Sequence, residues 1–284
     1  MPTLPPLKYL IKDVLELPRY RQQSKVASRR WRDRAEVIEY APPYRGTWGQ
    51  MRRRRLLKIE PEGGLEKVKG WFFYLHGGGW TFGKPDDFLS VADCVVAEGY
   101  GLIMPTYRRL PRYHCDQMLS DFRLSLVECN RRGWNLSTQA KPIMAGMSSG
   151  GHLAALIGLD SQLWTDANWS PPEHVLCCGA PLDLDAMPYY PGMSLLEGGN
   201  REISPVKVLE NANEVPNFLL IHPTHDGMAP LPQALSFYEV LKNKTATGKL
   251  HRVKDKGHLG AGRWMFDDNE TKRLIIQMLN DNAS

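Results

Sequence analysis

The feature that most constrains this chain is a pentapeptide at residues 146–150, Gly-Met-Ser-Ser-Gly, which places Ser148 between two glycines. An apolar run precedes it, and small residues that can begin a helix follow it. Glycines two residues before and after a serine remove the Cβ atoms that a sharp strand-to-helix turn cannot accommodate. We therefore predict that Ser148 stands on such a turn, with its hydroxyl held above the end of a strand. The alternative is a glycine-rich loop that merely contains a serine.

Short apolar runs predict strands along most of the chain, and helical patterns separate many of them. The predicted strands are residues 37–40, 56–59, 71–75, 102–104, 143–145, 174–178, 218–221 and 250–253. Residues 1 to about 35 are predicted to form one or two helices, and residues 183–213 are irregular in pattern. Strands that alternate with helices are typical of an α/β fold, in which helices cover both faces of a mainly parallel sheet.

Length and composition narrow the class of protein. The 284 residues are enough for one domain with a large core. The apolar runs are too short to span a membrane, and the charged N-terminal segment does not resemble a signal peptide. Five cysteines without metal-ligand spacing are typical of buried apolar residues. The sequence therefore predicts a cytoplasmic protein without a bound metal or cofactor.

The net charge of +5 is unevenly distributed, with arginine clusters at residues 29–34 and 52–55. Clusters of this kind occur in nucleic-acid and membrane contacts, but no recognition motif accompanies these two. We interpret them as solvated surface and predict no nucleic-acid partner. The sequence is compatible with a homo-oligomer.

Three polar side chains follow predicted strands, namely His76, Ser148 and Asp226. In parallel sheets, catalytic groups collect at the carboxyl ends of the strands. A serine hydroxyl needs a base, usually a histidine that a carboxylate orients. His258 is the predicted base because its loop, residues 254–260, follows the last strand. Asp226 is the predicted acid, and the competing carboxylates are Asp183, Asp185 and Asp255.

Three consecutive glycines follow the strand at residues 71–75, in the segment His76-Gly77-Gly78-Gly79-Trp80. Glycines let backbone amides turn inward, where they can stabilise the negative oxygen of a tetrahedral intermediate. We predict that the amides of Gly78, Gly79 and Ser149 form this oxyanion hole. A phosphate-binding loop is the alternative, but neither of its usual glycine patterns is present.

Together these residues resemble the α/β-hydrolases of the hormone-sensitive-lipase-like group, and most closely its BD-FAE-type esterases, which themselves resemble kynurenine formamidases. The resemblance rests on the HGGGW segment, Tyr107-Arg108, the segment GMSSGGHL, and the loops of Asp226 and His258. It runs from about residue 37 to the C-terminus. It implies an α/β-hydrolase fold with a small cap, with Ser148 as nucleophile, Asp226 as acid and His258 as base.

The expected activity is hydrolysis of small acyl or aryl esters through an acyl-enzyme. Arylformamide hydrolysis, acyl transfer to an alcohol and non-catalytic ligand binding are the alternatives. Residues 1–284 are predicted to form a single domain, with residues 1–35 as a cap-like segment and residues 183–213 as a lid insertion. The predicted substrate-binding side chains, which could equally pack beneath the lid, are Trp80, Phe82, Tyr189 and Tyr190.

Overall fold

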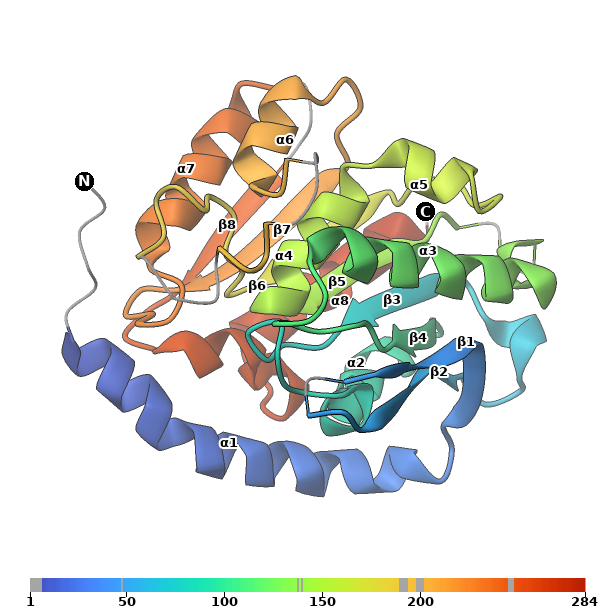
Figure 1. The fold of residues 1–284 in the computed structure, drawn as a ribbon. Helices are drawn as coiled ribbons and strands as arrows, with labels where there is room; N and C mark the ends of the chain where they lie inside the picture. The colour runs from blue at the N-terminus through green and yellow to red at the C-terminus, as the bar shows by residue number, and fades with distance from the viewer. Residues whose placement is uncertain are drawn as a thin grey trace.

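A twisted sheet of eight strands runs through the computed structural model, which describes residues 7–46, 48–136, 138, 140–188, 194–197, 202–244 and 248–283 (Figure 1). The strand order is β1-β2-β4-β3-β5-β6-β7-β8. Strands β1, β2 and β4 pair antiparallel, and every other neighbouring pair is parallel. The strands are β1 (Glu36–Arg45), β2 (Met51–Ile59), β3 (Trp71–Leu75), β4 (Gly101–Pro105), β5 (Ile143–Met147), β6 (His174–Cys178), β7 (Asn217–Pro223) and β8 (Gly248–Val253).

Helices cover both faces of the sheet, as the alternation of elements predicts. The α-helices are α1 (Leu7–Arg32), α2 (Ala92–Val95), α3 (Cys115–Arg131), α4 (Ser149–Gly158), α5 (Ser161–Thr165), α6 (Pro205–Asn211), α7 (Leu231–Lys242) and α8 (Glu270–Asn282). The 3-10 helices are η1 (Leu65–Lys67), η2 (Pro85–Val91), η3 (Trp134–Leu136) and η4 (His258–Met265).

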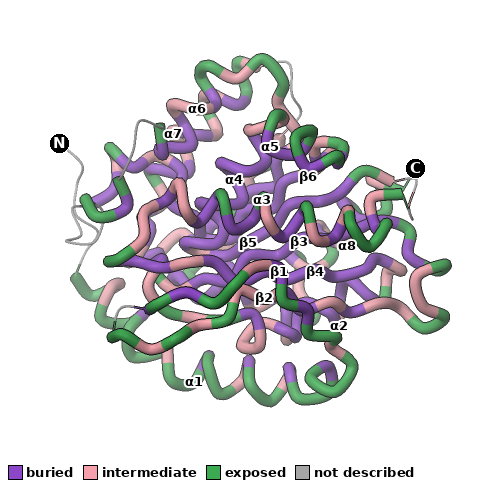
Figure 2. Tube along the Cα trace, turned by 45° about the vertical axis from the view of Figure 1, so that its right-hand side comes forward, coloured by how far each residue is buried: buried purple, intermediate pink, exposed green. Residues whose placement is uncertain are grey.

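Side chains of the sheet alternate between two apolar cores, one on each face. Figure 2 shows that the central strands are buried, whereas much of α1 is exposed. In β3, Phe73 joins the core formed with α3, α4 and α7, whereas Phe72 and Tyr74 join the core formed with α1, α2 and α8. All five residues of β3 are buried, as are all five of β5. The continuous apolar run at residues 71–75 therefore forms a strand that is covered on both faces of the sheet.

The N-terminal segment is one long helix, α1, which extends along the outside of the molecule and contacts η2 and η4 (Figure 1). Pro18 lies inside the helix without dividing it. The buried side chains of α1 include the aromatic Tyr20 and Trp31, but also the charged Asp13. This mixture explains why the helical pattern of the segment is broken in the sequence.

Several elements differ from the sequence-based expectation. Strand β1 continues to Arg45, beyond the predicted strand at residues 37–40. Register shifts between Glu39 and Ala41 and between Ala41 and Tyr44 accommodate two prolines on this edge strand. His258 begins a 3-10 helix instead of lying in an open loop. The irregular segment at residues 183–213 contains helix α6.

The arginine clusters lie at the end of α1 and along β2, where several members pair with carboxylates. Arg54 lies 3.2 Å from Asp121, and Arg55 lies 2.6 Å from Asp86.

Among the described residues, we find no helix whose length and apolar character suit a membrane span.

Candidate active site

Ser148 lies on the sharp turn between β5 and α4, as predicted from the glycine spacing. Its backbone has φ 54° and ψ −125°, and its amide donates to the carbonyl of Cys178 at 2.8 Å. The turn brings main chains so close that side chains are excluded on both sides. A Cβ atom on Gly146 would lie 2.3 Å from the carbonyl oxygen of Gly150, and one on Gly150 would lie 2.1 Å from that of Leu75.

Gly150→Ala should lower the free energy of unfolding by at least about 3 kcal/mol, because the methyl group meets fixed backbone and forces main chains apart. Gly79→Ala is the matched control: its Cβ meets no atom within 4 Å, although its φ is +57°. Left-handed strain alone costs about 1–2 kcal/mol there. Urea denaturation measures both values. Equal stabilities for the two variants would contradict the close contact at the turn.

The imidazole of His258 lies between the side chains of Ser148 and Asp226. Its Nε2 is 2.9 Å from Ser148 Oγ, and its Nδ1 is 2.8 Å from Asp226 Oδ2. A carboxylate only accepts hydrogen bonds, so Nδ1 carries a proton and donates it to Asp226. In the neutral ring, Nε2 is then the acceptor and faces the serine hydroxyl. This is the tautomer in which histidine can remove the serine proton.

The carboxylate of Asp226 is fixed on both oxygens. Oδ1 accepts the amides of Met228 at 2.9 Å and Ala229 at 2.7 Å, while Oδ2 faces His258. His222 donates Nε2–H to the carbonyl of Ala229 at 2.7 Å and so holds the same loop. Asp226 and His222 are both buried. The loop that follows β7 therefore presents one carboxylate oxygen to the imidazole in a fixed orientation.

The protein environment favours a positive charge on His258. Burial on its own would lower the pKa of this ring, but the negative charge of Asp226, its hydrogen bond and the charge of Asp13 outweigh burial and raise the pKa above 6.5. By contrast, burial lowers the pKa of His76 to about 3 and that of His152 to about 4. His76 and His152 therefore stay neutral at physiological pH, and His258 is the ring suited to gain and lose a proton.

The glycine loop after β3 lies against the serine turn. A Cβ atom on Gly77 would lie 3.0 Å from the carbonyl oxygen of Met147, and Gly78 and Gly79 have φ of 139° and 57°. Tyr107 donates its hydroxyl to the carbonyl of His76 at 2.8 Å and so supports the loop. Ser149 is the first residue of α4, where an amide has no partner within the helix.

The other candidate acids have different partners. Asp183 accepts the hydroxyl of Ser236 at 2.6 Å, and Asp185 pairs with Lys207 at 2.7 Å. Asp255 has a side chain that is 87% exposed. Asp226 alone among the four predicted carboxylates contacts His258 in the described part of the chain.

The predicted substrate-binding residues are not all alike in the structure. Trp80 is buried and packs edge-on against His152, to which its indole donates at 3.3 Å. Phe82 is 65% exposed. Tyr189 and Tyr190 lie outside the described residues, as do parts of the predicted lid.

One buried residue near the site was not predicted from the sequence. Asp13 of α1 accepts the amide of His258 at 2.7 Å and the amide of Gly227 at 2.8 Å. These two amides belong to the base itself and to the residue after the acid. The broken apolar pattern of the first helix is the one sequence signal that could have pointed to Asp13.

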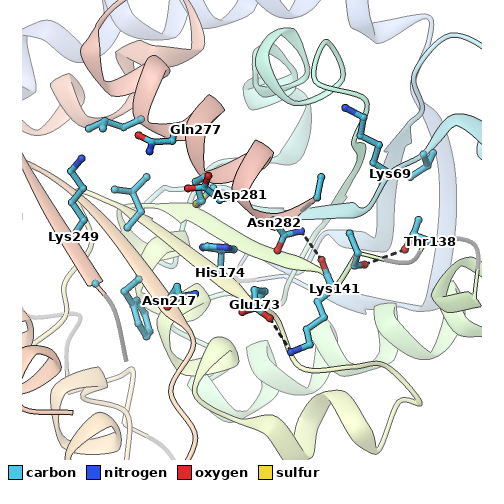
Figure 3. A pocket seen from close by; sticks show the side chains of 18 of the residues that line it. Lys69, Thr138, Lys141, Glu173, His174, Asn217, Lys249, Gln277, Asp281 and Asn282 are labelled. Carbon is cyan, nitrogen blue, oxygen red and sulfur yellow. Dashed lines mark hydrogen bonds and ion pairs between the residues drawn. The ribbon is translucent and has the colours of Figure 1, made fainter. Parts of the chain in front are cut away.

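A separate cavity of about 1380 Å³ opens at the opposite end of the parallel strands (Figure 3). His174, Asn217 and Gly248, the first residues of β6, β7 and β8, contribute to its lining. Its charges include both signs, and Lys141 pairs with Glu173 at 2.9 Å. Since Ser148 lies at the carboxyl end of β5, this cavity is not the candidate active site.

No group of three metal-binding side chains occurs in the ranges the structure describes.

The sheet order, the helices on both faces and the serine turn define an α/β-hydrolase fold. A family profile described as alpha/beta hydrolase fold matches residues 72–188, and one described as the prolyl oligopeptidase family matches residues 186–278. The first range contains Ser148 and the second contains Asp226 and His258. The α/β-hydrolase fold that the sequence predicted is confirmed. A sequence search of curated proteins finds no match.

Solved structures with the same fold include several hydrolases. The apo form of Thermogutta terrifontis esterase 2 is 18% identical, with a TM-score of 0.68, and the match covers 87% of this chain and 93% of that chain. The acetyl ester-xyloside bifunctional hydrolase from Caldicellulosiruptor lactoaceticus is 18% identical, with a TM-score of 0.66 and coverages of 87% and 96%. A truncated carbohydrate esterase from gut microbiota is 17% identical, with a TM-score of 0.62 and coverages of 80% and 90%.

Proposed function

We propose that this protein is a serine hydrolase that cleaves carboxylic esters through an acyl-enzyme. The observation that carries the proposal is the hydrogen-bonded line from Ser148 through His258 to Asp226, with distances of 2.9 and 2.8 Å. The chain order of nucleophile, acid and base is the one expected for a serine on a strand-to-helix turn. In this proposal Ser148 is the nucleophile, His258 the general base and Asp226 the residue that orients it.

The reaction proceeds in two steps. As Ser148 Oγ bonds to the ester carbonyl carbon, His258 Nε2 takes the hydroxyl proton and becomes an imidazolium that Asp226 stabilises. The imidazolium then protonates the alcohol oxygen as the C–O bond breaks, which leaves the acyl group on Ser148. In the second step, water loses a proton to His258 and adds to the acyl carbon. Breaking the acyl–Oγ bond returns the proton to Ser148 and releases the acid.

The amides of Gly78, Gly79 and Ser149 are the proposed donors to the oxygen that becomes negative in both steps. Within the described residues, the amides of Gly78 and Gly79 donate to no protein acceptor. The amide of Ser149 is at the N-terminus of α4, where the helix dipole also favours negative charge. Removing one donor of this kind typically costs about 3–4 kcal/mol of transition-state stabilisation.

Small acyl or aryl esters are the proposed substrates. Support comes from the titles of the solved structures with this fold, which name an esterase, a carbohydrate esterase and an acetyl ester hydrolase. A further structure, of the same Thermogutta terrifontis esterase 2, is described as phosphorylated by paraoxon. Aryl formamides are the second substrate class to test, because the HGGGW and GMSSGGHL segments also resemble those of kynurenine formamidases.

A fluorophosphonate should add its mass to Ser148, as peptide mass spectrometry would show, and Ser148→Ala should abolish the adduct. Ser120→Ala, which removes an exposed serine from α3, is the matched control and should label like the wild type. Turnover is then measured on p-nitrophenyl esters of increasing acyl length and on an aryl formamide.

An unlabelled Ser148 in a protein that still hydrolyses the esters would contradict the proposal. Labelling without turnover of any ester or formamide would favour a ligand-binding protein with this fold. Transfer of the acyl group to added alcohol in preference to water would assign the same residues to an acyltransferase.

A further inference from the structure

Asp13 joins the two loops that carry the proposed acid and base. Its Oδ2 accepts the amide of Gly227 at 2.8 Å, and its Oδ1 accepts the amide of His258 at 2.7 Å. The side chain is fully buried. Its partners are 214 and 245 residues away in the sequence, so the first helix connects segments from the end of the chain.

The helix fits against these loops because glycines lie at the closest points. A Cβ atom on Gly227 would lie 2.3 Å from the amide nitrogen of Leu10, and one on Gly257 would lie 2.0 Å from Asp13 Oδ1. Neither glycine has a positive φ. Glycine is therefore required at these two positions because a side chain would clash with α1, and not because of the backbone conformation. Tyr9 also stacks on His225, with ring centroids 4.5 Å apart.

The titratable groups around His258 come from three elements, and two of these groups are carboxylates. Asp226 faces it from the loop after β7, Asp13 from α1, and His222 from β7. Burial raises the pKa of Asp13 above its usual 3.8, although the amide of Gly227 and the charge of His258 oppose this. A carboxyl whose pKa is raised by folding binds its proton more tightly in the native state, so its ionisation lowers stability as the pH rises. Ionised Asp13 therefore does not act as a net source of folding stability.

We propose that Asp13 is a positioning residue, which fixes the distance between the acid and base loops and stabilises the imidazolium that His258 forms during the reaction. This role rests on the proposed function of Ser148, His258 and Asp226. The carboxylate does not touch the imidazole; it acts through the main chain of residues 227 and 258 and through its charge.

Asp13→Asn tests the role, because the amide keeps the shape but loses the charge and turns a donor toward one of the two backbone amides. Displacement of a catalytic group by about 1 Å can cost 10²-fold in rate, and we expect kcat to fall by about that factor with KM little changed. The pKa of the His258 imidazole, followed by NMR titration, should move down. Glu16→Gln removes a carboxylate from the exposed face of the same helix and should change neither quantity.

An Asp13→Asn variant with wild-type kcat and a wild-type His258 titration would overturn the proposal. A fall in kcat without a change in that titration would assign Asp13 a structural role only. If Asp13→Asn does not fold, the wild type supplies the test: the carboxyl ¹³C resonance of Asp13 should respond to protonation of His258, and its failure to respond overturns the proposal. Both titrations are independent of turnover, so they remain decisive even if wild-type protein hydrolyses no ester.

Discussion

His258→Gln should lower kcat for an activated short-chain ester by about 10⁶-fold, since a nucleophile and its base act as one unit and removing either costs almost as much as removing both. His258 Nε2 is 2.9 Å from Ser148 Oγ, and no other histidine contacts this hydroxyl in the described residues. Glutamine can still donate to Asp226, which keeps the buried carboxylate from losing its partner. Stopped assays over days, or a radiolabelled ester, provide the sensitivity that such a loss requires.

The matched control is His251→Gln, which changes a histidine on β8 near Glu270. We expect this variant to stay within about twofold of the wild type, because His251 has no hydrogen bond to Ser148, His258 or Asp226 among the described residues. Circular dichroism verifies the fold of both proteins. If His258→Gln retained activity within tenfold of the wild type, the base would have to be another group.

Asp226→Asn should lower kcat by about 10⁴-fold, as the same change does in a related triad that keeps its geometry. The asparagine amide would face His258 Nδ1 as a donor, so the ring would favour the tautomer with its proton on Nε2. That tautomer cannot accept the proton of Ser148. A kcat measured with folded protein, together with fluorophosphonate labelling rates, checks the expectation.

The three competing carboxylates are the controls for this prediction. Asp183→Asn, Asp185→Asn and Asp255→Asn should each change kcat far less, because none of these carboxylates contacts His258 in the described residues. Their partners include Ser236, Lys207 and His225 respectively. The assignment of the acid would be wrong if one of these variants lost activity while Asp226→Asn stayed within about tenfold of the wild type. Ser148 and His258 would keep their proposed roles in that case.

The α/β order and the serine turn could be predicted because their signals are local. Apolar runs such as residues 71–75 indicate strands buried on both faces. The glycines on either side of Ser148 are needed because a Cβ atom there would lie only 2.1 to 2.3 Å from a backbone oxygen. The positions of Asp226 and His258 followed from chain order and from the edge at which parallel strands end. The distances and hydrogen bonds between Ser148, His258 and Asp226 could not be predicted from the sequence and come from the structure.

Other features depend on contacts that no local pattern records. Asp13 is a charged residue within an irregular helical pattern. Its carboxylate accepts hydrogen bonds from two backbone amides more than 200 positions away, which no local pattern indicates. The two prolines in β1 are unfavourable for a strand in general, yet an edge strand tolerates them because one side of it needs no hydrogen bonds. His258 looks like a loop residue, but η4 begins there and buries it.

The order of the last four strands has a consequence for synthesis on the ribosome. From β5 to β8, each strand lies beside the one made just before it, so the sheet can grow outward as the chain emerges. The serine arrives with β5, the aspartate after β7 and the histidine after β8. A nascent chain that ends before β7 thus exposes a serine with neither proposed activator. Reactivity toward a fluorophosphonate would then report that the final edge of the sheet has been added.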